Sequence, residues 1–139
     1  MDRISKEQRS ALMKHVKQSG TEQEMLVRRG LHKRGLRYVI GDRRLPGRPD
    51  LSFPKYRAVV FVHGCFWHGH SCGRGVASRT NTDYWVPKIT ANKVRDAKVE
   101  SELVALGWRV FVVWGCKLRN ASTREGVLEE LAAKIVAKP

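Results

Sequence analysis

Two short, purely apolar segments constrain the fold of this chain more than any other feature. Ala58–Val62 and Val110–Trp114 each contain five apolar residues in a row, most of them valine. Runs of this length and composition, bounded by polar residues, are typical of strands buried inside a sheet. They are also far shorter than the roughly 18–20 residues that a membrane-spanning helix needs. The two segments therefore predict the centre of a sheet.

Helical patterns lie on both sides of these segments. Ser5, Thr21 and Ser122 are expected N-caps, and Gly35 and Gly107 are expected to end helices. The predicted helices span about residues 6–18, 22–34, 82–106 and 122–137, and the predicted strands span 36–40, 50–53, 57–62 and 108–114. In 139 residues this order predicts one α/β domain, residues 1–139, with a mixed sheet flanked by helices.

The charge of the chain is strongly basic. With 27 Lys and Arg against 13 Asp and Glu, the net charge is +14, and residues 1–48 alone supply +8 of it through 13 basic and 5 acidic side chains. Such an excess favours a polyanionic partner, with nucleic acid first and an anionic membrane surface second.

The N-terminus and the cysteines indicate the compartment. Residues 1–6 are too polar for a signal peptide, so we expect a cytoplasmic, reducing environment. Cys65, Cys72 and Cys116 are therefore poor disulfide candidates and better candidates for metal ligands or reduced thiols.

The segment 63–72, His-Gly-Cys-Phe-Trp-His-Gly-His-Ser-Cys, gathers two cysteines and three histidines within ten residues. Cys116 follows a buried strand and could return to this loop. Structural zinc takes four nitrogen or sulfur ligands in a tetrahedron. The set that fits best is Cys65, His70, Cys72 and Cys116. The alternative is a group of buried thiols beside ordinary histidines.

Asp50 is the second chemical candidate. It follows Arg48-Pro49 and begins a strand whose successor delivers further groups, an arrangement with which many nucleases hold Mg²⁺. The acidic-x-Lys element usual on the second strand is missing, since that strand reads Val60-Phe61-Val62-His63. The alternative is an ordinary Pro-Asp turn.

The helix predicted over 82–106 carries polar residues on its apolar face. That face consists of Trp85, Ile89, Asn92, Asp96, Val99, Leu103 and Leu106. Asn92 and Asp96 interrupt it, and buried polar groups need partners. Either they form structural hydrogen bonds to a neighbouring loop, or this part of the face borders a polar site, as the nearby Lys88 would suit.

Five motifs together resemble the very-short-patch repair (Vsr) endonucleases: Leu-Pro-Gly-Arg-Pro-Asp, Val-Phe-Val-His-Gly-Cys-Phe-Trp-His, Trp-x-x-Lys-Ile, Leu-Gly-Trp-Arg-Val and Val-Trp-x-Cys. The resemblance extends from Met13 to Cys116 and the closing helix. It implies a zinc-containing restriction-endonuclease-like fold. It also implies a Mg²⁺-dependent enzyme that nicks one DNA strand beside the thymine of a G·T mismatch, the product of 5-methylcytosine deamination.

The resemblance also implies roles for individual residues. Asp50 matches the metal-bridging aspartate, and the carbonyl of Val62 matches one that a threonine supplies in the best-known members. His68 matches the general base, which Asp96 supports, while Glu24 and His63 match further active-site groups. Cys65, His70, Cys72 and Cys116 match the zinc ligands.

Recognition is expected from a different set of residues. By the same resemblance, Phe66, Trp67 and Trp85 intercalate beside the mismatch, and Met13 is a wedge from an N-terminal arm, residues 1–20, that contacts DNA. We also expect Lys88 and Asn92 to contact DNA. The alternatives are a capping role for Glu24 and core packing for Met13, Phe66 and Trp67.

The expected partner is double-stranded DNA with a G·T mismatch, and other mismatch-repair proteins are further candidate partners. The protein is expected to act as a monomer in the bacterial cytoplasm, at the nucleoid. Two other functions fit parts of the sequence: a zinc-stabilised DNA-binding module without catalysis, and a related restriction-type nuclease that cuts both strands. Asp50 and His68 separate the first alternative, because a binding module needs neither residue.

Overall fold

The computed structural model describes residues 22–65 and 82–137. Its elements are α2 (Glu22–Lys33), β1 (Val39–Ile40), β2 (Leu51–Phe53), the 3-10 turn η1 (Pro54–Tyr56), β3 (Ala58–His63), α3 (Thr82–Ala105), β4 (Arg109–Trp114), α4 (Gly115–Leu118) and α5 (Ala121–Val136). The helix predicted over 6–18 and most of the loop 64–75 lie outside the described residues. The predicted α/β architecture is confirmed.

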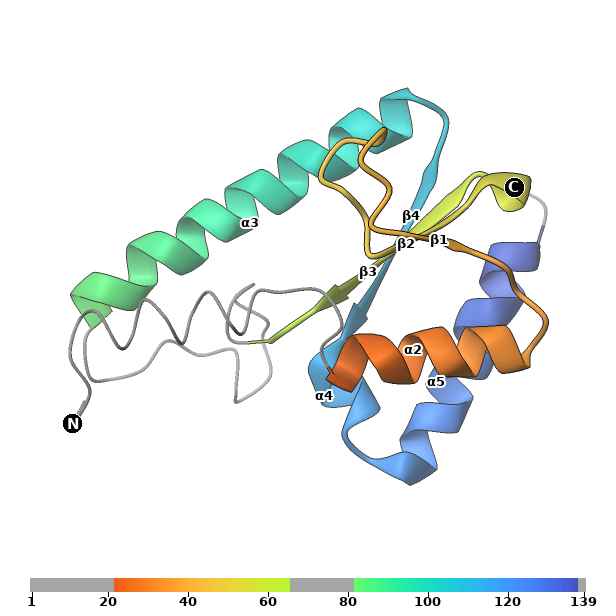
Figure 1. Cartoon of the computed structure of the whole chain (residues 1–139). Coiled ribbons are helices and arrows are strands. Elements are labelled where there is room, and N and C mark those ends of the chain that lie inside the picture. The colour runs from red at the N-terminus through yellow and green to blue at the C-terminus, as the bar shows by residue number, and fades with distance from the viewer. Residues whose placement is uncertain (1–21, 66–81, 138–139) are drawn as a thin grey trace.

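The four strands form one mixed sheet in the order β1-β2-β3-β4. β1 pairs antiparallel with β2, and β2 with β3, while β3 and β4 are parallel, from Ala58 opposite Arg109 to His63 opposite Trp114. A parallel pair needs a long crossover connection, and α3 forms part of it. The carboxyl ends of β3 and β4 therefore lie at the same edge of the sheet (Figure 1).

The hydrophobic core lies between the sheet and the helices α2 and α5, while α3 runs along the opposite side of the sheet (Figure 1). Strand side chains alternate between the two faces. Val60 and Val113 point into this core and meet Leu31 of α2 and Leu128 and Ile135 of α5. Full burial of each such side chain stabilises the fold by roughly 1.5–3 kcal/mol.

The predicted stop signals Gly35 and Gly107 are confirmed. Both have positive φ, +86° and +88°, where a residue without Cβ is not strained. After α2, the N–H of Leu36 donates to Leu31 O at 3.1 Å; after α3, the N–H of Trp108 donates to Leu103 O at 3.0 Å. Both helices thus end in a Schellman motif, which satisfies their last carbonyl groups.

Two predicted boundaries are wrong, one by two residues and one by three. The N-cap of α5 is Asn120 rather than Ser122, because Asn120 Oδ1 accepts the N–H of Ser122 at 2.9 Å. The strand predicted over 36–40 is reduced to β1, since Leu36 is used to close α2 and is buried in the core. The short helix α4 was not predicted at all, because four residues leave no periodic pattern.

The apolar face predicted for α3 is confirmed in its middle. Ile89, Asn92 and Leu103 are buried, whereas Leu106 is 53% exposed, contrary to the prediction. The physical reason is that α3 ends at Ala105, so Leu106 lies beyond the last residue of the helical face.

Arg109 joins the start of β4 to the end of α5. Its Nη1 donates to the carbonyl oxygens of Lys134 and Ala137, each at 3.0 Å, and its Nη2 donates to Ile135 O at 2.8 Å and Tyr56 O at 2.9 Å. Carbonyl groups at the end of a helix have no partner within the helix. One guanidinium therefore caps α5 and ties it to the β2–β3 hairpin.

None of the described helices combines the length and apolarity that crossing a lipid bilayer demands.

Candidate active site

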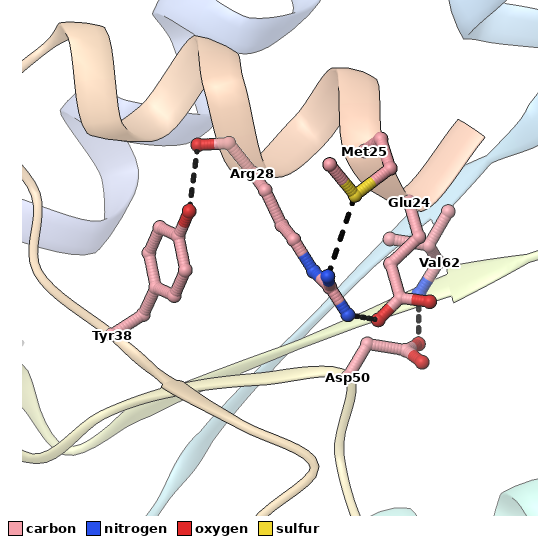
Figure 2. Close-up of polar contacts among 6 residues, drawn as sticks. All are labelled: Glu24, Met25, Arg28, Tyr38, Asp50 and Val62. Atoms are coloured by element: carbon pink, nitrogen blue, oxygen red, sulfur yellow. Dashed lines mark hydrogen bonds and ion pairs between the residues drawn. The ribbon is translucent and has the colours of Figure 1, made fainter. Parts of the chain in front are cut away.

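Asp50 directly precedes β2, and its side chain continues the hydrogen bonding to β3 beyond the last regular residue pair. Leu51, the first residue of β2, is opposite Val60. β2 therefore offers no carbonyl group as an acceptor for the N–H of Val62. The carboxylate of Asp50 takes that place and accepts the Val62 N–H through Oδ2 at 2.7 Å (Figure 2). The N–H and C=O of one strand residue point to the same side, so the Val62 carbonyl also lies on the side of Asp50.

The predicted motif around Asp50 forms a tight turn that fixes its position. Gly47 has φ +71° and Arg48 has φ +52°, both in the left-handed region, and Pro49 is fully buried. A Cβ on Gly47 would lie 2.2 Å from Val99 Cγ1 of α3, so only glycine fits. The N–H of Gly41 donates to Asp50 O at 3.1 Å, which anchors the other side of the loop.

Glu24 reaches the same place from the first turn of α2. Its Oε1 lies 2.6 Å from Arg28 Nη2, one helical turn further along, and its side chain is only 4% exposed (Figure 2). Arg28 was not singled out from the sequence. The spacing of an acidic residue and a basic residue four positions later was the available signal, because such pairs face each other on a helix.

The surroundings of Asp50 make its carboxyl unusually basic. Burial is the main cause that raises its pKa from 3.8 to about 6, and the negative charge of Glu24 adds to it. The hydrogen bond from Val62 and the positive charge of Arg28 act in the opposite direction. Displaced carboxyl pKa values of this kind are found preferentially at functional sites.

These residues match the requirements of a magnesium ion. Asp50 keeps Oδ1 available while Oδ2 accepts the Val62 N–H, and Glu24 and the Val62 carbonyl offer further oxygen atoms. Mg²⁺ prefers oxygen ligands and typically binds through one or two carboxylates with water and substrate phosphate in the other positions. The donor set of Asp50, Glu24 and Val62 therefore fits this cation.

The predicted residues His63 and Trp85 lie on the α3 side. His63 alternates with Val62 along β3, is 8% exposed, and packs edge-on against Trp114 with ring centroids 5.3 Å apart. At the start of α3, the ring of Trp85 packs edge-on against Tyr84 at 4.8 Å, and the ammonium group of Lys88 lies 4.9 Å from the Tyr84 centroid.

Asn92 and Asp96 lie further along the same helix. Asn92 is buried, and its Oδ1 accepts a hydrogen bond from Arg95 Nη2 at 3.1 Å. This bond comes from the same helix, one turn further along. Asp96 is half-buried. Their expected parts in DNA contact and in support of the general base stay predictions.

Two of the four predicted zinc ligands are brought together. The backbone N–H of Cys116 donates to Cys65 Sγ at 3.3 Å, across the edge where β3 and β4 end. No cluster of three or more His, Cys, Asp or Glu side chains occurs within residues 22–65 and 82–137. The other two ligands, His70 and Cys72, lie outside those ranges, as do Met13, Phe66, Trp67 and His68.

Comparison with known proteins decides the family. The family model described as DNA mismatch endonuclease Vsr matches residues 1–74, more than half of the chain. The chain belongs to the Vsr family. Over 125 residues it is 41% identical to the DNA mismatch endonuclease Vsr of Escherichia coli, covering 88% of this chain and 80% of that protein.

Other Vsr relatives are named as nicking enzymes. The type II nicking enzyme V.XorIIP of Xanthomonas oryzae is 47% identical over 130 residues, 94% of this chain and 96% of its own length. V.NmeAIP of Neisseria meningitidis is 43% identical over 134 residues, 96% of each chain. The chain is thus a Vsr-family DNA-nicking endonuclease with DNA as its substrate.

A surface hollow of about 480 Å³ does not belong to this site. It is lined by Asp42, Arg44, Leu45, Pro54, Arg57, Leu106 and Trp108. None of the predicted catalytic residues lines it. The hollow is therefore separate from the candidate site beside Asp50.

Proposed function

We propose that this protein is a Mg²⁺-dependent endonuclease that nicks DNA beside the thymine of a G·T mismatch and so starts very short patch repair. The observation that carries the proposal is the position of Asp50, which is held by Val62 and lies beside Glu24 at the end of the sheet. A DNA-binding module without catalysis would not need two neighbouring carboxylates in a partly buried site.

Each residue of the site has a part in this proposal. Asp50, Glu24 and the carbonyl of Val62 would hold the cation near the scissile phosphate. The cation, when bound, would stabilise the negative charge that develops there and lower the pKa of water. His68 takes the proton of the attacking water, and Asp96 keeps the imidazole of His68 oriented. His63 contacts the same phosphate from the α3 side.

Recognition is assigned to groups at the start of α3 and to the segments on either side of it. Lys88 and the Tyr84–Trp85 pair present a cation and aromatic rings at the start of α3. We propose that Trp85 joins Phe66 and Trp67 in opening the base step beside the mismatch, with Met13 on the other side and Asn92 near the bases. Side chains inserted between base pairs are a known device for recognising deformable steps.

A structural zinc ion is part of the same proposal. Cys65 and Cys116 provide two thiolates, and the hydrogen bond from the Cys116 N–H to Cys65 Sγ is of the kind that orients metal ligands. His70 and Cys72 would complete the tetrahedron. The ion would hold the aromatic segment 66–67 next to the active site.

The decisive experiment is a nicking assay on duplexes that differ only in one base pair, G·T, A·T or G·C. With Mg²⁺ we expect a single-strand nick in the G·T duplex alone, and no cleavage once a chelator removes Mg²⁺. Equal nicking of all three duplexes would contradict mismatch specificity and favour a site-specific nicking enzyme, a name that several relatives carry. Cleavage of both strands would favour the restriction-type alternative.

A further inference from the structure

Arg28 is a charged residue of the site to which the proposed reaction assigns no part. Its Nη2 lies 2.6 Å from Glu24 Oε1, and the two side chains are 14% and 4% exposed. The carboxylate of Asp50 points toward the same pair (Figure 2). One cation and two carboxylates thus share a partly buried space.

Arg28 is anchored by Glu24 and at its main chain, and its guanidinium has donors to spare. Its main-chain oxygen accepts the hydroxyl of Tyr38 at 3.1 Å, and Nη1 faces only the weak acceptor Met25 Sδ at 3.4 Å (Figure 2). Nε is buried, with no hydrogen-bond partner among the residues that the structure describes. Because a guanidinium carries five N–H donors, Arg28 can bind a further acceptor that arrives from outside.

When both carboxyls are ionised, the charges of the site balance only with a cation and a phosphate together. Asp50, Glu24 and Arg28 together carry −1 when both carboxyls are ionised. A divalent cation alone brings the sum to +1, whereas a divalent cation and one DNA phosphate together bring it to zero. Without Arg28 the cation alone would neutralise the site. Charge imbalance is more unfavourable in a poorly hydrated site than in water.

We infer that Arg28 couples metal binding to DNA binding, by weakening divalent-cation binding in the free protein and favouring it once a DNA phosphate is present. The inference rests on the proposed metal site at Asp50 and Glu24. Coupling is reciprocal, so the cation must strengthen DNA binding by the same factor. The consequence is a nuclease that acquires its catalytic metal on the DNA rather than before it.

Calorimetric titration with Ca²⁺, an oxygen-binding divalent cation, tests this at constant ionic strength, without DNA and with a saturating short G·T duplex. The variants are Arg28→Met, which removes the charge, and Arg28→Lys, which keeps it. Arg29→Met is the control, because Arg29 is the exposed neighbour on α2. Thermal melting establishes that each variant is folded.

We expect Arg28→Met to bind Ca²⁺ at least about tenfold more tightly than the wild type in the absence of DNA. The gain in Ca²⁺ affinity that DNA gives the wild type should shrink by a similar factor. Arg28→Lys and Arg29→Met should behave as the wild type. Free Arg28→Met with unchanged or weaker Ca²⁺ affinity would overturn the inference. So would a wild type whose Ca²⁺ affinity does not rise on DNA, an outcome that needs no variant to fold.

Asp50→Asn separates this inference from the function proposed above. If Asp50→Asn binds Ca²⁺ as the wild type does, the proposed metal site itself is wrong. If Asp50→Asn loses Ca²⁺ binding while Arg28→Met matches the wild type, the metal site stands and only the part assigned to Arg28 fails.

Discussion

Asp50 is a residue whose charge opposes folding. Burial and the carboxylate of Glu24 raise its pKa from 3.8 to about 6, so the native state holds this proton more tightly than the unfolded chain does. By linkage, stability then falls as the pH rises from about 4 to about 6, and the loss is complete above that range. The function proposed for Asp50 requires the ionised carboxylate, so the site trades stability for metal binding.

Replacing Asp50 by asparagine should therefore stabilise the protein while abolishing nicking. In magnesium-free buffer at pH 7.5 we expect Asp50→Asn to raise the free energy of unfolding by about 1–2 kcal/mol, and at pH 4 the difference should vanish. Urea denaturation at both pH values measures this, and DNA affinity should be largely retained.

Asp42→Asn is the matched contrast. The side-chain hydrogen bond from Arg44 is the main cause that lowers the pKa of Asp42. Its ionised form is therefore favoured in the folded state, and that stability is lost only as the pH falls through the lowered pKa. Asp42→Asn should weaken the protein at pH 7.5. An Asp50→Asn protein that is likewise less stable at that pH would contradict the account of Asp50.

Arg109 illustrates a second use of charge at single-residue scale. Its four hydrogen bonds to carbonyl oxygens depend on the forked guanidinium, which an ammonium group cannot reproduce. We expect Arg109→Lys to lower the free energy of unfolding by about 1–3 kcal/mol, measured by urea denaturation, whereas Arg119→Lys at an exposed position should change little. Equal stability of the two variants would show that the fork adds nothing.

At the scale of elements, the turn before β2 places the site through its contact with α3. Gly47 packs against Val99 in a conformation that only glycine adopts without strain. The turn, α3 and Asp50 are therefore positioned together. A change at Gly47 must move either α3 or Asp50.

Gly47→Ala should accordingly lower both stability and activity. The positive φ and the 2.2 Å approach of a Cβ to Val99 Cγ1 predict a loss of about 2–4 kcal/mol, measured by thermal or urea denaturation. Nicking by the folded fraction should fall as well. The control is Gly126→Ala, since a Cβ at Gly126 in α5 would meet nothing within 4 Å, and that change should be neutral or stabilising. A fully stable Gly47→Ala protein would disprove the packing argument.

The sequence predicts some elements better than others, for physical reasons. β3 and β4 are predictable because their sequences are unbroken valine-rich runs. The ends of α2 and α3 are predictable because the positive φ of the residue after each helix favours glycine. The predicted length of β1 is too great because Leu36 closes the end of α2 instead of belonging to the strand. The capping oxygen of α5 comes from Asn120 two positions earlier than expected, since both residue types cap helices equally well.

In the candidate site, too, some residues could be predicted from the sequence and others could not. Asp50 lies in a motif of the family, the resemblance also matches Glu24 to an active-site group, and the structure brings the two together. Arg28 was missed because arginine on a helix is ordinary in sequence, and only the fold shows that its charge is buried beside two carboxylates.

At the scale of the whole molecule, the basic side chains behind the +14 charge do not all lie free to contact DNA. Several arginines are used inside the fold: Arg34 and Arg124 donate to the carbonyl oxygens of Gly30 and Leu118, as Arg109 does to those of α5. Net charge still favours a polyanionic partner. The part of it available for phosphate contacts is smaller than the composition suggests, because guanidinium groups also act as caps for buried backbone.

The zinc site is the prediction that concerns the molecule as a whole, because Cys65 follows β3 and Cys116 follows β4. Purified protein should contain one zinc ion per chain, and Cys116→Ser should lose it together with several degrees of melting temperature, since structural zinc contributes to folding free energy. Elemental analysis and thermal melting measure both effects. Freshly purified, unchelated protein without zinc would rule the site out.

The hydrogen bond between Asp50 and Val62 also makes one backbone amide a reporter of the site. The amide hydrogens of β3 that bond to neighbouring strands are protected from exchange with solvent by the sheet, whereas that of Val62 is protected by a single carboxylate. Its exchange rate therefore follows the state of Asp50: faster in Asp50→Ala, and altered when a cation occupies the carboxylate. Hydrogen–deuterium exchange at this one position would register metal arrival without any cleavage taking place.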